Sequence, residues 1–98
     1  MAIDITPDEL KERLSNQEKL HIIDVREPYE YEEQNIGAIN IPLNTLPQKL
    51  VDLEDLQDEE VIVHCRSGAR SASAKAFLEQ QGFTNVRNMV GGMLAYQA

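Results

Sequence analysis

Cys65 is the only cysteine of the chain, and it stands at the junction of two contrasting segments. An apolar, β-branched run at residues 61–65 ends at it, small and cationic residues follow at 66–71, and an alanine-rich pattern covers 72–81. The sequence therefore predicts a strand, a turn and a helix with a thiol at the hinge. Beyond the carboxyl end of a buried parallel strand, where open α/β folds bind ligands, the loop amides and the first amides of the helix are expected to converge above the sulfur.

This setting favours the ionised form of the thiol. The amide-rich loop, the positive end of the helix and the guanidinium groups of Arg66 and Arg70 would all lower the pKa of Cys65 from the value of about 8.5 of a free thiol. The same groups would stabilise a persulfide or the oxyanions of a substrate. Small residues (Ser67, Gly68 and Ala69) let the backbone curl, and Gly68 can adopt the positive φ that such a curl demands.

The spacing of cysteine and arginine leaves several reactions open. Arg70 follows Cys65 with four residues between them, a spacing shared by thiol phosphatases, arsenate reductases and sulfur transferases. Between Val61 and Lys75 there are three cations and no carboxylate, so a locally positive anion site is predicted. The loop thus narrows the chemistry to attack by a cysteine on an anion.

Composition excludes other classes of function. A length of 98 residues fits one domain, 1–98, and 42% hydrophobic residues argue against disorder. The net charge of −8 opposes binding to nucleic acid or anionic lipid. Without an apolar run of membrane-spanning length or a signal-peptide pattern at the start, a cytoplasmic protein with no membrane partner is expected. One cysteine and two distant histidines predict neither a disulfide nor a metal site, and no cofactor is expected.

Strand and helix patterns alternate along the whole chain. Strands are predicted at residues 1–5, 20–25, 37–42, 61–65 and 83–89. Helices are predicted at residues 7–14, where Thr6 caps, at 28–34, once or twice within 44–56, at 72–81 and at 93–96. Alternation of this kind favours an α/β fold with a mostly parallel sheet and helices on both faces.

Four ordered motifs together resemble a single-domain rhodanese, a thiosulfate sulfurtransferase. They are IDVRE at residues 23–27, GAINIP at 37–42, VHCRSGARS at 63–71, and GFTNV at 82–86 followed by GGMLAY at 91–96. The resemblance implies a rhodanese-like fold with a five-stranded sheet, a persulfide on Cys65, and an anion cradle formed by the loop that ends at Arg70. In this family a six-residue loop from cysteine to arginine is typical of sulfane-sulfur transfer, whereas the related phosphatases have a loop one residue longer.

The implied mechanism has two steps. The Cys65 thiolate attacks the outer sulfur of thiosulfate or of a persulfide donor, and in the first case sulfite leaves. The persulfide then remains until a thiol, cyanide or a protein sulfur acceptor removes it. A thiolate that is already formed needs no general base, and His64, on the opposite face of the strand from Cys65, is interpreted as structural.

Three further residues receive supporting roles from their positions. Arg70 is expected either to bind the substrate or to pair with a carboxylate beneath the loop, and Asp24, at the end of the second predicted strand, is the candidate for that carboxylate. Arg26 is expected to brace strand ends, and Arg66 to face solvent and contact the substrate. Two alternatives stay open: a rhodanese-type binding or sulfur-carrier module without turnover, and a cysteine phosphatase.

Overall fold

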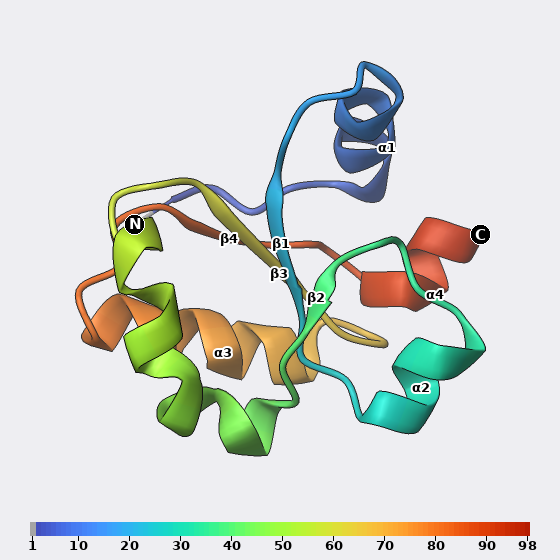
Figure 1. Ribbon diagram of the computed structural model, residues 1–98. Coiled ribbons are helices and arrows are strands. Elements are labelled where there is room, and N and C mark those ends of the chain that lie inside the picture. Colours follow the sequence, from blue (N-terminus) through green and yellow to red (C-terminus); the bar gives the residue numbers. More distant parts are fainter. Residues whose placement is uncertain (1) are drawn as a thin grey trace.

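The computed structural model describes residues 2–98. In chain order its elements are α1 (Pro7–Ser15), β1 (His21–Asp24), α2 (Pro28–Glu33), β2 (Ile39–Asn40), the 3₁₀ helix η1 (Leu43–Leu56), β3 (Val61–His64), α3 (Ala69–Gln80), β4 (Val86–Asn88) and α4 (Gly92–Gln97) (Figure 1). The predicted alternation of strands and helices is confirmed. None of the helices within this range has both the length and the apolar composition needed to cross a membrane.

The sheet has four parallel strands in the order β2-β1-β3-β4. β3 lies between β1 and β4, with Val63 opposite Ile23 on one side and Val61 opposite Val86 on the other. All four residues of β3 are buried, as expected for an apolar strand between two parallel neighbours. The carboxyl end of β3, which Cys65 follows, therefore lies between the carboxyl ends of two neighbouring strands.

The prediction of five strands is wrong at the start of the chain. Within the described residues, the first segment contributes only an isolated parallel bridge between Ile5 and Met89. The Ile5 amide donates to the Asn88 carbonyl, and the Ile5 carbonyl accepts from the Val90 amide. Thr6 already caps α1, accepting from the Glu9 amide at 3.1 Å as predicted, so the helix begins before a longer strand can form. Met1 lies outside the described residues.

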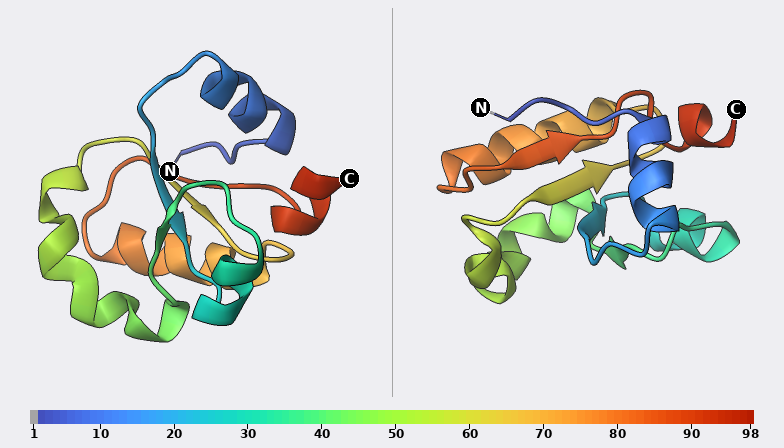
Figure 2. Two further views of the ribbon diagram at one scale, coloured as in Figure 1. Left: turned by 45° about the vertical axis from the view of Figure 1, so that its right-hand side comes forward. Right: turned by 90° about the horizontal axis from the view of Figure 1, so that it is seen from above.

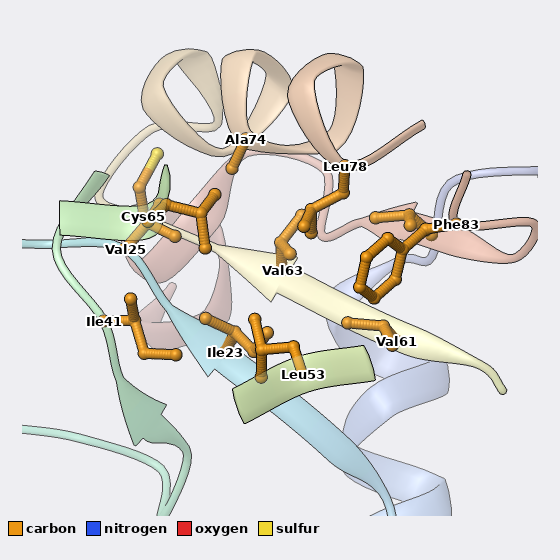
Figure 3. Packing of buried hydrophobic residues seen from close by; sticks show 12 residues of the cluster. Ile23, Val25, Ile41, Leu53, Val61, Val63, Cys65, Ala74, Leu78 and Phe83 are labelled. Carbon is orange, nitrogen blue, oxygen red and sulfur yellow. The ribbon is translucent and has the colours of Figure 1, made fainter. Parts of the chain in front are cut away.

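Helices cover both faces of the sheet, which confirms the layered α/β architecture. On one face, Val63 packs with Leu53 of η1 and Leu78 of α3 (Figure 3). On the other face, Ile62 belongs to a separate cluster that includes Leu10 of α1. Figure 2 shows α3 and η1 together on one side of the strands, away from α1. Alternate residues of β3 therefore serve two cores, and Cys65 belongs to the one beneath α3.

The segment from Leu43 to Leu56 also differs from its prediction. Residues 44–56 were expected to hold one or two amphipathic helices, and they form a single 3₁₀ helix with Pro47 inside it. A proline has no amide hydrogen and disfavours a regular α-helix at that point. The expected apolar face is present, because Leu46 and Leu53 are buried.

His64 is a fully buried polar residue on the α1 side of the sheet. Neither ring nitrogen has a hydrogen-bond partner within residues 2–98, and Nε2 is 3.7 Å from Oδ2 of Asp24. Burial lowers the pKa of His64 below 6.5; the carboxylate of Asp24 opposes this shift and the guanidinium of Arg26 adds to it. The histidine is therefore neutral in the folded protein at neutral pH, which agrees with a structural role.

This burial predicts a loss of stability on mild acidification. As the pH falls below 6.5, the histidine of the unfolded chain binds a proton more readily than buried His64 does. Unfolding is then favoured by at most about 1.4 kcal/mol per pH unit. In His64→Leu this part of the slope of unfolding free energy against pH, measured by urea titration between pH 7 and 5.5, should vanish. His21→Gln, which replaces an exposed histidine, is the control and should keep the wild-type slope; an unchanged slope in His64→Leu contradicts the prediction.

Candidate active site

The loop between β3 and α3 encloses the sulfur of Cys65. The thiol is 1% exposed, and its Sγ accepts from the Gly68 amide at 3.1 Å and the Ser71 amide at 3.3 Å. The helix α3 begins at Ala69, three residues earlier than its predicted start, and Gly68 precedes it with φ 104°. The positive φ expected of Gly68 is thus present, and it turns the first amides of α3 toward the sulfur.

These contacts favour the thiolate over the thiol. Burial alone raises the pKa of Cys65, but hydrogen bonds from the Ser71 hydroxyl and from the amides of Ser71, Gly68 and Ser67 outweigh it. The net result is a pKa below the ordinary value of a cysteine. A group of fixed donors around one sulfur can stabilise a thiolate, or another anion bonded to it, without a general base.

A serine and an asparagine that the sequence analysis did not single out extend this network. The Ser71 hydroxyl lies 3.3 Å from Sγ of Cys65 and 2.6 Å from Oδ1 of Asn88. The other end of the Asn88 side chain, Nδ2, donates to the carbonyl of Gly68 at 3.2 Å. Because that carbonyl can only accept, it fixes which way the amide of Asn88 points. Asn88 therefore links β4 to the loop. Its Oδ1 is an acceptor, so it shares the single hydroxyl proton of Ser71 with Sγ of Cys65.

Arg70 and Asp24 do not form the expected pair. The guanidinium of Arg70 binds both oxygens of Glu30 on α2, at 2.8 and 3.1 Å, and this contact lowers the pKa of Glu30 to about 2. Asp24 is instead bonded to Arg26, two residues later in the chain. The candidate partner of Arg70 was therefore wrong: Asp24 is already taken by a nearer arginine, and α2 brings a carboxylate that is 40 residues distant in the sequence.

The Asp24–Arg26 pair fastens the end of β1 to the end of α2. Both side chains are buried, with Nη2 of Arg26 2.7 Å from Oδ2 of Asp24 and Nε 3.0 Å from Oδ1. The same Nη2 donates to the carbonyl of Gln34 at 2.7 Å. The guanidinium of Arg26 thus donates its hydrogen bonds to groups inside the protein.

The start of α4 fixes the outer side of the cysteine loop. The Met93 amide donates to the carbonyl of Cys65 at 2.9 Å, and the Leu94 amide donates to that of Arg66 at 3.0 Å. Gly92 comes so close that a Cβ there would lie 2.5 Å from both carbonyl oxygens. With these carbonyls turned toward α4, the following amides can face the sulfur.

A pocket of about 300 Å³ opens beside the loop. Its walls come from α2, from α4 and from Arg66, the exposed residue that follows Cys65. In Figure 1, α2 and α4 lie on the same side of the molecule as the loop before α3. The structure thus brings together the predicted loop residues and adds to them two helices whose contribution the sequence did not reveal.

Comparison with known proteins gives consistent matches along the chain. Residues 6–98 match the family described as the rhodanese-like domain. A sulfurtransferase of Allochromatium vinosum is 35% identical over 97 residues, which are 98% of this chain and 89% of the relative. The thiosulfate sulfurtransferase PspE of Escherichia coli is 38% identical over 72 residues, 72% of this chain and 69% of PspE. The crystal structure of a rhodanese-like domain protein from Staphylococcus aureus has a TM-score of 0.86 at 35% identity, with 98% of this chain and 91% of that chain covered.

Removal of the Ser71 hydroxyl should raise the pKa of Cys65. Ser71→Ala deletes a donor 3.3 Å from the sulfur. Loss of a hydrogen bond to a charged group should lower the fraction of Cys65 that is thiolate, and with it the rate of alkylation by iodoacetamide, about tenfold at pH values below the pKa. The measurement is the alkylation rate of the folded protein as a function of pH. Ser73→Ala, an exposed serine of the same helix, is the control. Superimposable profiles for Ser71→Ala and the wild type would contradict the role assigned to this hydroxyl.

The close approach of α4 predicts a steep cost for a methyl group at Gly92. Gly92→Ala combines a positive φ of 60° with a 2.5 Å contact to the loop carbonyls. Gly37 has a φ of 83° with nothing within 4 Å of an added Cβ, so Gly37→Ala is a matched control for the backbone cost alone. We expect Gly37→Ala to lose about 1–2 kcal/mol of unfolding free energy and Gly92→Ala to lose about 1–3 kcal/mol more. Equal losses in urea titrations would show that the contact is relieved at little cost.

Proposed function

The chain belongs to the rhodanese-like family, and from this premise we propose that it transfers sulfane sulfur through a persulfide on Cys65. The proposal rests above all on the donors that converge on Sγ: the amides of Gly68 and Ser71 and the Ser71 hydroxyl. Relatives named as sulfurtransferases support sulfur transfer as the class of reaction. Within this class, the proposed sulfur donor is thiosulfate and the proposed acceptor is a thiol or cyanide.

In the first step the thiolate of Cys65 attacks the outer sulfur of thiosulfate. A new S–S bond forms on the protein, the S–S bond of thiosulfate breaks, and sulfite leaves with the bonding electron pair. No proton or external electron is required, so the step needs no general base once the thiolate exists. The amides at Ser67, Gly68 and Ala69 and the exposed guanidinium of Arg66 form the cradle that receives the donor anion.

In the second step an acceptor thiolate attacks the outer sulfur of the persulfide. The S–S bond on the protein breaks, its electron pair returns to Cys65 as thiolate, and the acceptor leaves as a persulfide. With cyanide the product is thiocyanate. The donors that stabilise the thiolate also stabilise the leaving Cys65 sulfur in this step.

Arg70 closes the loop in this scheme and does not grip the substrate directly. Its guanidinium is held in a two-point contact by Glu30, so its hydrogen-bonding edge is occupied. The positive charge still favours an anion on Cys65 through space. Asp24 and Arg26 support the site indirectly, because their contacts connect the end of β1 to the end of α2.

The proposal predicts a sulfur adduct that depends on one residue. After incubation with thiosulfate and removal of the excess, intact-protein mass spectrometry should detect a gain of one sulfur atom, which is lost on treatment with cyanide. Cys65→Ser should gain nothing, because a hydroxyl at this position is far less acidic than a thiol. Thiocyanate formation from thiosulfate and cyanide should likewise be confined to the wild type.

Two results would count against this function. If the wild-type protein neither gains sulfur nor forms thiocyanate, the transferase proposal fails and a binding module remains. If it hydrolyses a chromogenic aryl phosphate and this activity is absent in Cys65→Ser, the phosphatase alternative replaces it.

A further inference from the structure

The pocket between α2 and α4 contains two charged side chains with no partner of their own. Arg66 and Glu33 both line it, and neither side chain forms a hydrogen bond or ion pair within residues 2–98. The other two charged groups of the wall are already neutralised, Arg26 by Asp24 and Glu30 by Arg70. The pocket thus offers one free cation, next to Cys65, and one free carboxylate, on α2.

The wall also includes exposed apolar side chains. Tyr29 on α2 and Leu94 on α4 both line the pocket, with 64% and 52% of their surfaces exposed. A volume of about 300 Å³ matches the lower range of pockets that hold small organic molecules. This volume suits a ligand with a short carbon skeleton, and the two free charges of the wall suit one that carries a group of each sign.

The position of the pocket connects it to the reacting sulfur. Arg66 follows Cys65 in the loop, and its carbonyl accepts from the amide of Leu94, another lining residue. Glu30, also in the wall, is bonded to Arg70 at the end of the same loop. The walls are therefore attached to both ends of the cysteine loop.

We propose that this pocket binds the sulfur acceptor, and that the acceptor is a small thiol carrying an ammonium group and a carboxylate. The carboxylate faces Arg66, the ammonium faces Glu33, and the carbon skeleton lies against Tyr29 and Leu94. Thiosulfate fits the whole pocket less well than such a thiol, because it is a dianion without a cationic group: Arg66 attracts it to the cradle, but Glu33 repels it. The inference rests on the proposed function, since the bound thiol must react with a persulfide on Cys65.

The chemical step is a balanced exchange of one sulfur atom. The thiolate of the acceptor forms a bond to the outer sulfur of the persulfide, and the bond from that sulfur to Cys65 breaks. The electron pair stays on Cys65, which leaves a thiolate on the protein and a persulfide on the acceptor. No oxidant or reductant takes part.

The test compares four thiols on protein that already carries the persulfide. Cysteine has both charged groups, cysteamine only the ammonium, 3-mercaptopropionate only the carboxylate, and 2-mercaptoethanol neither. The protein is loaded with thiosulfate, freed of excess, and mixed with each thiol, and persulfide loss is followed by mass spectrometry. Each rate is divided by the wild-type rate for the same thiol, which cancels the intrinsic reactivity of that thiol.

Two substitutions on α2 form a matched pair. Glu33→Gln removes the free carboxylate of the pocket, whereas Glu32→Gln makes the same change at the neighbouring exposed residue outside the pocket. In Glu33→Gln the relative rate should fall about threefold for cysteine and cysteamine and rise about threefold for 3-mercaptopropionate, as expected for a single exposed charge. In Glu32→Gln the four relative rates should be equal. High salt should shrink the differences in Glu33→Gln.

The outcomes separate this inference from the proposed function. If persulfide forms but Glu33→Gln and Glu32→Gln give the same relative rates for all four thiols, the acceptor site is overturned and sulfur transfer stands. If the persulfide reacts with none of the four thiols, the inference is likewise overturned, and a protein acceptor takes its place. If no persulfide forms with thiosulfate, the proposed function fails and the inference falls with it.

Discussion

The contact between the sulfur of Cys65 and the first amides of α3 depends on how the loop is bent. Gly68 turns the chain through a φ of 104°, which a residue with a side chain rarely adopts. On the other side, α4 holds the carbonyls of Cys65 and Arg66, so the peptide groups cannot rotate their amides away. The bend of the loop therefore depends on the positive φ of Gly68 and on the hydrogen bonds from α4. Both lie beyond the end of β3, a strand whose residues are all buried.

Charges hold the neighbouring helix in place. The helix α2 has six residues and buries none of them, so apolar packing contributes little to its position. One ion pair and one hydrogen bond from a charged side chain attach it instead. Glu30 within α2 binds Arg70, and Arg26, paired with Asp24, donates to the carbonyl of Gln34 at the end of α2. Such contacts determine the orientation of α2 more than they add to the free energy of unfolding. The pocket wall that α2 provides is thus set by the same arginines that stand next to the cysteine loop.

Local signals in the sequence predicted the parts of the site that are continuous in the chain. Three such predictions are confirmed, because each depends only on neighbouring residues: the strand before Cys65, the positive φ of Gly68 and the Thr6 cap. The prediction of a fifth strand failed, because the alternation at residues 1–5 does not show that pairing stops where α1 begins. Among the described residues only Ile5 forms a bridge, to Met89. The partner of Arg70 was missed for a similar reason: Asp24, Glu27 and Glu30 are equivalent in sequence, and only the fold decides which is near. Asn88 gave no signal, since its contact with Ser71 spans 17 residues.

The distribution of free charge also distinguishes the candidate reactions on grounds other than loop length. An enzyme that transfers a phosphoryl group must stabilise charge on several oxygens at once, usually with an arginine that binds two of them. Here the arginine at the end of the loop already binds two carboxylate oxygens of Glu30. What remains around Cys65 is a set of uncharged donors and the exposed Arg66, an environment that suits the single negative charge of a thiolate or persulfide. The ion pair between Arg70 and Glu30 therefore leaves only Arg66 of the loop to stabilise the oxygens of a transferred phosphoryl group. This matters less for thiosulfate, because the sulfur atom that it transfers carries no oxygen.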